Sequence, residues 1–179
     1  IKKLLFIPLG LIVSFCAPKK EITDKDKTAV EAKKINLADS NCPEDGICSI
    51  EVIKNKSIIV KTDDFGSNYY LLEDNENTSV IYYKYDRNFE KDLQDAYYKE
   101  EIAFEVSNDV NHLILSDEEL QDTKMLYGRL CFCKGQTGFF KVTKGALKYT
   151  KKGNEIVIDL DFENQKVPQI IKKIKTTIK

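Results

Sequence analysis

The sequence predicts a mainly β domain, an antiparallel sandwich or barrel, behind an N-terminal segment of different character. Large apolar residues alternate with mostly polar ones over 101–106 and again over 155–162. This period of two is typical of strands with one buried and one solvated face. The repeating units are short and are separated by turn-forming residues, while no alternation of strands with long helices occurs. These features favour antiparallel pairing over a parallel sheet.

The remaining strands are less regular, and clusters of Asn, Gly, Asp and Lys separate them at 54–56, 74–77, 143–145 and 152–154. Such clusters are typical of turns. Strands are expected at 49–53, 57–62, 68–73, 79–85, 112–115, 124–133, 138–143 and 146–150.

Two helices are expected among the strands. Ser116, followed by Asp117, Glu118 and Glu119, has the form of a capping box and predicts a short helix over 117–122.

Pro168 fits the first turn of a C-terminal helix, and Ile170, Ile174 and Ile178 would lie on one of its faces. Thr176 and Thr177 are poor helix formers, which leaves a last strand as the alternative. The isoleucines would dock on the β core, or the basic helix would lie on anionic lipid.

Residues 1–15 carry Lys2 and Lys3 near their start and continue with an apolar run that ends just before Cys16. As a helix, the run would reach about 18 Å, short of the ~30 Å hydrocarbon core of a bilayer. A removable targeting segment therefore explains it better than a membrane span.

A basic start, a short apolar run and a cysteine at its end resemble the signal peptide of a bacterial lipoprotein. The Lys-, Asn- and Ile-rich composition and β-rich body resemble small lipoproteins of Bacteroidota. The resemblance implies that Cys16 receives diacylglycerol and acyl chains such as palmitate, and becomes the membrane-anchored N-terminus. An ordinary secretory peptide is the alternative. The residues after Cys16 lack the acidic export cluster of surface-exposed lipoproteins of that phylum, which favours an outer-membrane position facing the periplasm.

Residues 16–40 are expected to form the lipidated cysteine and a flexible tether, and 41–179 a single β-rich domain. The stretch 17–40 carries six Lys against five Asp or Glu and no aromatic residue, so it can bury little apolar surface. Residues 41–163 carry 15 Lys or Arg against 24 Asp or Glu, a net charge of −9. An acidic body argues against nucleic acid as a partner, because nucleic acid requires a clustered basic face.

Lipidation of Cys16 would leave four cysteines, which are expected to be oxidised in the cell envelope. Two crosslinks between the Cys42–Cys48 loop and a strand carrying Cys131 and Cys133 are predicted. A zinc site is the competing interpretation, although the spacings differ from those of zinc knuckles.

No catalytic residue, metal ligand or cofactor is predicted. His112 is the only histidine and is interpreted as a strand-edge residue. Asp159 and Asp161 would share one face of a strand, as a glycosidase pair would, but a solvated sheet face explains them more simply. Exposed tyrosines could bind an envelope protein or glycan, with cross-strand ring packing as the alternative. The candidates are Tyr69, Tyr70, Tyr82, Tyr83 and Tyr85.

We therefore expect a membrane-tethered envelope lipoprotein that acts as a non-enzymatic binding or assembly module. An envelope hydrolase that uses carboxylates is the alternative.

Overall fold

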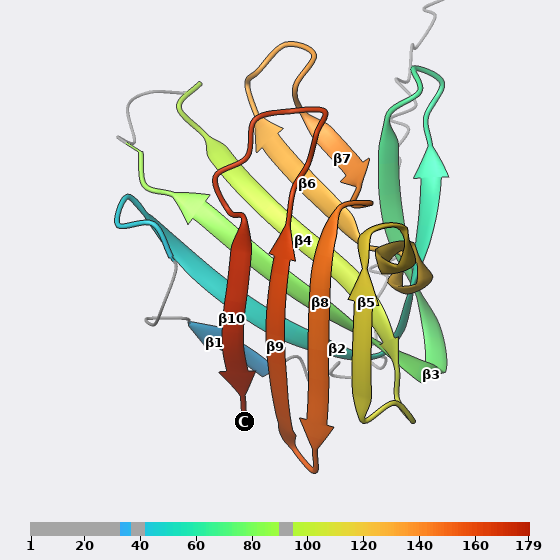
Figure 1. Cartoon of the computed structure of the whole chain (residues 1–179). Helices are drawn as coiled ribbons and strands as arrows, with labels where there is room; N and C mark the ends of the chain where they lie inside the picture. Colours follow the sequence, from blue (N-terminus) through green and yellow to red (C-terminus); the bar gives the residue numbers. More distant parts are fainter. Residues whose placement is uncertain (1–32, 37–41, 90–94) are drawn as a thin grey trace, which may run out of the picture.

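The computed structural model of this chain describes residues 33–36, 42–89 and 95–179 (Figure 1). Cys16, the predicted signal segment and most of the predicted tether lie outside this part. Residues 33–36, predicted as tether, instead form a strand that pairs with residues 49–52. In the part that is described, no helix is long and apolar enough to span a bilayer.

The described residues are mainly β, as predicted, and their strands pair antiparallel in two sheets. A six-stranded sheet has the order β1-β2-β3-β4-β6-β7 and a four-stranded sheet the order β10-β9-β8-β5. In Figure 1 the four-stranded sheet lies in front of the six-stranded one. The elements are β1 (Lys33–Asn36), β2 (Gly46–Thr62), β3 (Asn68–Arg87), β4 (Tyr98–Ser107), β5 (His112–Ser116), η1 (Asp117–Thr123), β6 (Leu126–Cys131), β7 (Gly138–Lys141), β8 (Gly145–Lys152), β9 (Glu155–Phe162) and β10 (Lys173–Ile178).

The main core fills the space between the two sheets. Alternate residues of β2, β3, β4, β8, β9 and β10 point into it, which explains the period of two in the sequence. One buried cluster joins both sheets and includes Ile50, Ile81, Ile102 and Tyr127 from the six-stranded sheet and Leu147, Leu160, Ile174 and Ile178 from the four-stranded sheet.

The prediction of turns at 54–56 and 74–77 is wrong, because β2 and β3 continue through both positions. Lys54 pairs with Ser79 whereas Lys56 pairs with Asp74, so the register shifts between them. Asn55 lies at this irregularity with a φ of 57°. Asparagine tolerates positive φ in β-bulges as well as in turns, so its presence does not distinguish the two.

Beyond this irregularity, the distal hairpin (residues 56–74) covers the outer face of the six-stranded sheet. Its Ile58 joins a second buried cluster with Val80, Ala103 and Leu126. Asn68 also pairs with Phe139, which connects β3 to β7. The irregularity in the two long strands therefore creates a separate small core.

The predicted C-terminal helix is wrong, since its residues form β10 and pair with β9 from Ile178↔Ile156 to Lys173↔Asp161. Ile174 and Ile178 are buried against the main core. A spacing of four residues keeps side chains on one face of a strand as well as one face of a helix. The expected docking of these isoleucines on the β core is thus realised by a strand.

The predicted short helix is present as the 3₁₀ helix η1, and its capping box forms. The amide nitrogen of Ser116 lies 2.9 Å from Oε2 of Glu119. Leu120 is fully buried and packs the helix against the main core.

Candidate functional site

A buried carboxylate, Glu100 of β4, binds the chain that leads into β10. Its Oε1 and Oε2 each accept a backbone hydrogen bond at 2.7 Å, from the amides of Ile170 and Ile171. The hydroxyl of Tyr98 donates a third to Oε1 at 2.5 Å. With both oxygens engaged, Glu100 acts as a structural anchor between segments far apart in the sequence.

Arg129 of β6 organises the loop between β6 and β7. Its Nη1 donates to the backbone oxygen of Gln136 at 3.1 Å and to the side-chain oxygen at 2.9 Å. The hydroxyl of Thr137 donates to the Arg129 carbonyl at 3.1 Å. The guanidinium also lies 5.4 Å from the centre of the Tyr98 ring, a cation–π distance. The loop is therefore held by polar contacts on both sides.

The phenols of this network serve as hydrogen-bond donors. Burial and the hydrogen bond to Glu100 raise the pKa of Tyr98. Burial, together with the nearby charge of Glu100, also raises the pKa of Tyr127. Both hydroxyls stay protonated near neutral pH, so they stabilise the fold and are unsuited to transferring a proton near pH 7.

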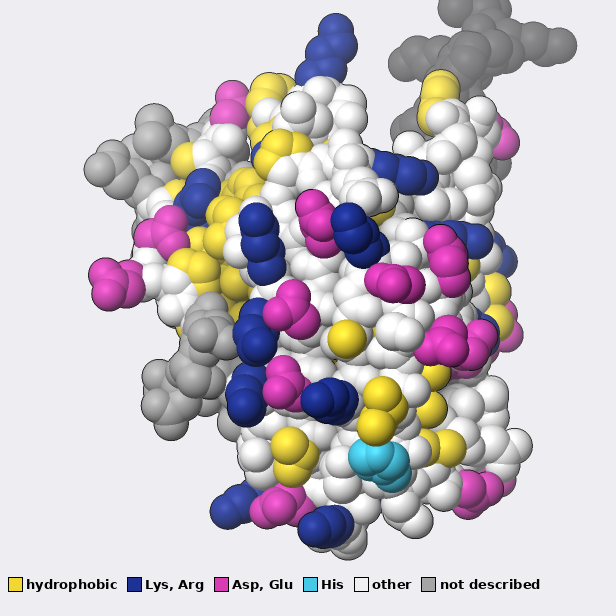
Figure 2. Space-filling view, viewed as in Figure 1, with side chains coloured by type: hydrophobic (Ala, Val, Ile, Leu, Met, Phe, Trp, Pro, Cys, Tyr) yellow, Lys and Arg dark blue, Asp and Glu magenta, His cyan; other side chains and the backbone are white. Residues whose placement is uncertain are grey.

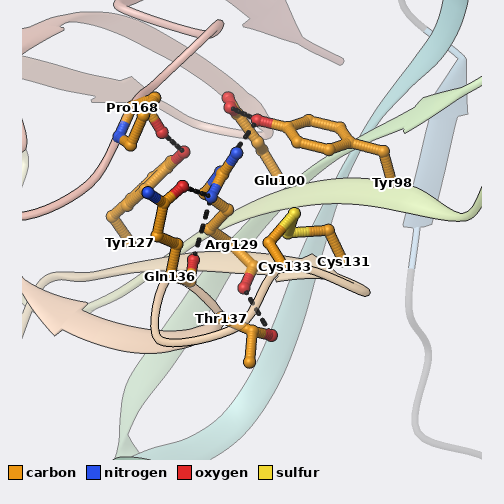
Figure 3. The surroundings of a disulfide bond; sticks show 9 residues. All are labelled: Tyr98, Glu100, Tyr127, Arg129, Cys131, Cys133, Gln136, Thr137 and Pro168. Carbon is orange, nitrogen blue, oxygen red and sulfur yellow. Dashed lines mark hydrogen bonds between the residues drawn. A yellow bond between two sulfur atoms is a disulfide. The ribbon is translucent and has the colours of Figure 1, made fainter.

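A disulfide between Cys131 and Cys133 lies at the beginning of the β6–β7 loop (Figure 3). β6 ends at Cys131, and the amide of Gln136 donates to the Cys133 carbonyl at 3.0 Å in the turn that follows. The Cα atoms of the two cysteines are 5.2 Å apart. The expectation that both cysteines lie on one strand is therefore wrong.

The second disulfide joins Cys42 and Cys48, with Cα atoms 5.7 Å apart. All four cysteines are thus paired, as predicted, but the predicted crosslinks between the two regions are wrong. Cys48 on β2 and Cys131 on β6 are separated by β3 and β4. Three strand spacings amount to roughly 14 Å, whereas disulfides require about 4.4–6.8 Å between Cα atoms. The sulfurs are also unavailable as the zinc ligand set that was the alternative.

The two disulfides differ in their surroundings. Cys48 is 2% exposed and belongs to the main core. Cys131 and Cys133 are both partly exposed. They line a surface cavity of about 460 Å³ together with Phe132, Lys134 and Thr137. Phe132 is 80% exposed, so an apolar ring stands beside an accessible disulfide.

The candidate tyrosines do not gather on one surface. Tyr83 and Tyr85 are buried in the main core, and Tyr70 and Tyr82 pack against the second core. The Tyr70 ring meets Phe139 edge-on at 5.1 Å, and burial raises the pKa of Tyr70 to about 12. Of the five, only Tyr69 is exposed. Ring packing therefore accounts for most of the tyrosine cluster.

Other apolar side chains of the distal hairpin are exposed. Phe65 at its turn is 94% exposed, and Leu71 and Leu72 are 44% and 36% exposed. Asp63 Oδ1 fixes the turn by accepting from the amides of Phe65 at 2.9 Å and Ser67 at 2.8 Å. The phenylalanine is thus presented to solvent by an ordered turn.

Asp159 and Asp161 lie on the solvated face of β9, as expected. Asp161 Oδ2 is 3.6 Å from Lys173 Nζ, and Asp159 Oδ2 is 3.7 Å from Lys175 Nζ. Figure 2 shows basic and acidic side chains interspersed over the front of the molecule, where the four-stranded sheet lies. Within residues 42–89 and 95–179, no group of His, Cys, Asp or Glu side chains is arranged to hold a metal ion.

Four residues of the site were not predicted from the sequence: Phe65, Phe132, Glu100 and Arg129. Phe65 follows two aspartates and precedes a glycine, a combination typical of a tight turn whose central side chain is exposed. Phe132 stands between two cysteines at a strand end. Glu100 and Arg129 carry no local signal, because their partners are distant in the sequence.

Comparisons with protein-family models, with curated proteins and with solved structures found no match.

Proposed function

We propose that the protein is a membrane-tethered lipoprotein of the bacterial envelope whose β domain is a non-enzymatic binding or assembly module. The lipid on Cys16 would anchor the chain, in the outer membrane and facing the periplasm. Residues 17–32, which precede β1, would act as a tether with a mean reach of about 20–24 Å. This reach would let the domain engage a partner near the same membrane.

The exposed apolar side chains of the distal hairpin are the observation that supports a binding role. Phe65 is 94% exposed, Leu71 44% and Tyr69 40%, all on one projecting element. Aromatic residues dominate the binding energy of many protein interfaces. Presentation of Phe65 on a turn fixed by Asp63 reduces the entropy that binding would have to offset.

The chemistry of the hairpin favours a protein partner over a glycan. Phenylalanine and leucine offer apolar area without hydrogen-bonding groups, which suits apolar side chains of an envelope protein. A glycan partner would depend on Tyr69 instead, because a phenol can both stack on a sugar and hydrogen-bond with it.

A carboxylate hydrolase is less well supported. The cavity beside the Cys131–Cys133 disulfide has no Asp or Glu in its lining, and neither has a second cavity between the sheets near Tyr149. Among the described residues two carboxylates are buried, Glu100 and Glu101; they are neighbours on β4 and so point to opposite faces. Glu100 is saturated by backbone amides and Glu101 lies 3.5 Å from Lys99.

The anchor is tested by replacing Cys16 with serine in the full chain. We expect wild-type protein to incorporate labelled palmitate and to sediment with membranes. The Cys16→Ser protein should carry no label and should leave the membrane fraction. Equal labelling and equal sedimentation of the two proteins would overturn the anchor.

Binding is tested by placing a photo-crosslinking residue at position 65 of the lipidated protein in intact cells. The matched control carries it at position 114 on β5, where Ile114 is 60% exposed. We expect a defined protein adduct from position 65 that disappears when Leu71→Ser is added. Adducts that are identical from both positions, or unchanged by Leu71→Ser, would overturn the hairpin as the binding surface.

A further inference from the structure

We propose that the Cys131–Cys133 disulfide is a thiol–disulfide exchange site whose substrate is a pair of thiols in another polypeptide. This activity goes beyond the binding role of the distal hairpin and does not depend on it. Three features support it: the disulfide is accessible to solvent, other contacts also hold its loop, and the neighbouring side chains suit a polypeptide substrate.

The bond is accessible to an attacking thiol. Cys131 and Cys133 are both partly exposed and line the surface cavity of about 460 Å³. In the other disulfide Cys42 is also partly exposed, but its partner Cys48 is 2% exposed within the main core, so that bond is the more shielded of the two. Exposed disulfides are the labile or catalytic ones, whereas shielded disulfides resist exchange.

Contacts other than the bond also hold the surrounding loop. The disulfide closes a loop with a single intervening residue, so it restricts the unfolded chain less than a crosslink over a longer loop would. The loop is held independently by the Arg129–Gln136 and Thr137–Arg129 hydrogen bonds. β6 and β7 also pair from Leu126↔Lys141 to Arg129↔Gly138. These contacts would hold the loop in the reduced state as well as in the oxidised one.

The nearby side chains suit exchange with a polypeptide. Phe132, 80% exposed between the two cysteines, offers a contact for apolar residues next to a substrate cysteine. Arg129 lies two residues before Cys131 on β6, hence on the same strand face, and Lys134 lines the cavity. Positive charge near a sulfur stabilises the thiolate formed when the bond opens.

The exchange proceeds in two balanced steps. A substrate thiolate attacks Sγ of Cys133, forming a mixed disulfide and releasing Cys131 as a thiolate. Cys133 is the sulfur attacked because it lies in the loop, whereas Cys131 packs against the main core. The second substrate thiolate then attacks the substrate sulfur of the mixed disulfide and releases Cys133. Two electrons pass from the substrate dithiol, which becomes a disulfide, to the site, which becomes a dithiol.

The first test uses the purified, oxidised full chain in detergent with dithiothreitol at pH 7. Samples are quenched with an alkylating agent over time, and peptide mapping measures each disulfide separately. We expect Cys131–Cys133 to open faster than Cys42–Cys48 by about tenfold or more, as expected for an exposed against a shielded bond. The far-ultraviolet circular dichroism spectrum should stay unchanged. The proposal would be overturned if both disulfides were reduced at the same rate. It would also be overturned if Cys131–Cys133 were reduced only while the circular dichroism spectrum of the folded protein was being lost.

The second test uses a reduced peptide with two cysteines flanked by apolar residues. Wild-type protein should oxidise one peptide per chain, and Phe132→Ser should slow the reaction. The Cys131→Ala/Cys133→Ala protein, which keeps the other disulfide, should oxidise none. Peptide oxidation at the same rate by this double variant would overturn the site. Should the variant fail to fold, the comparison of the two disulfides in the wild-type chain still decides.

Discussion

The carboxylate of Glu100 accepts a hydrogen bond from the backbone amide of Ile171, with Oε2 and the nitrogen 2.7 Å apart. Glu100 belongs to the six-stranded sheet, and Ile171 lies just before β10 of the four-stranded sheet. One side chain thus joins the two sheets at a position where the connecting chain is not in a strand. The bond meets the requirement that a buried backbone N–H must have a partner.

The Glu100→Gln protein should be destabilised by about 3 kcal/mol, because one buried amide would face an NH₂ group and lose its acceptor. Urea unfolding followed by circular dichroism measures the change. The Glu118→Gln protein is the control, since Glu118 is exposed on η1 and should unfold within about 0.5 kcal/mol of wild type. Equal midpoints for the two variants would contradict the anchoring role.

Acid should destabilise the protein through Glu105 of β4. Burial alone would raise the pKa of Glu105, but the Lys124 ammonium, the Ile58 amide and the Ser57 hydroxyl together hold it below its ordinary value of 4.5. The resulting stabilisation is complete at pH values above the ordinary value. It is lost as the pH falls through the lower, folded-state pKa.

Unfolding free energies measured between pH 7 and pH 3 should therefore fall more steeply for wild type than for Glu105→Gln, and the difference should appear below about pH 4.5. The slopes separate because the variant has no proton to take up at this position. Parallel pH profiles would show that the contacts of Glu105 do not stabilise the fold.

The strand β10 should be stabilised by its isoleucines far more than by its lysines. Ile174 is 3% exposed, so Ile174→Ala should lower the unfolding free energy by about 2–4 kcal/mol. Lys173 forms a solvent-exposed pair with Asp161, and Lys173→Ala should cost less than about 1 kcal/mol. Similar losses in the two variants would contradict the packing of β10.

Removal of each disulfide should have a different effect on stability. The loop-entropy model gives about 1–2 kcal/mol for Cys131→Ala/Cys133→Ala and about 2–3 kcal/mol for Cys42→Ala/Cys48→Ala. The second variant also loses a buried sulfur, because Cys48 lies in the main core. Melting temperatures of the two proteins in the same buffer test this order, and the reverse order would contradict it.

Local patterns in the sequence predicted much of the fold. The alternation over 155–162 predicted β9, and the Ser116–Glu119 capping box predicted η1, because these signals depend on neighbouring residues only. The pattern around Ile174 and Ile178 was ambiguous, since a spacing of four suits a helix and a strand alike. These residues form a strand because they pair with β9 and because Ile174 and Ile178 are buried against the main core.

The candidate site was less predictable. Cysteine connectivity depends on strand order, which places β3 and β4 between Cys48 and Cys131. Tyrosines adjacent in the sequence point to opposite faces of a strand, and the outward faces here are covered when the distal hairpin folds over the sheet. Tyr70 and Tyr82 are packed for this reason.

The central claim, that the distal hairpin binds another envelope protein, is tested most directly by quantitative affinity purification of the lipidated protein from solubilised envelopes. Phe65→Ser/Leu71→Ser removes apolar area from the hairpin, and Ile114→Ser/Val157→Ser removes exposed apolar area from the four-stranded sheet. We predict that the recovered amount of a partner protein is at least about tenfold lower with the hairpin variant than with wild type. A tenfold loss corresponds to about 1.4 kcal/mol of binding free energy. The sheet variant should recover the same amount of the partner as wild type. Recovery of the same proteins in equal amounts with both variants would contradict the account.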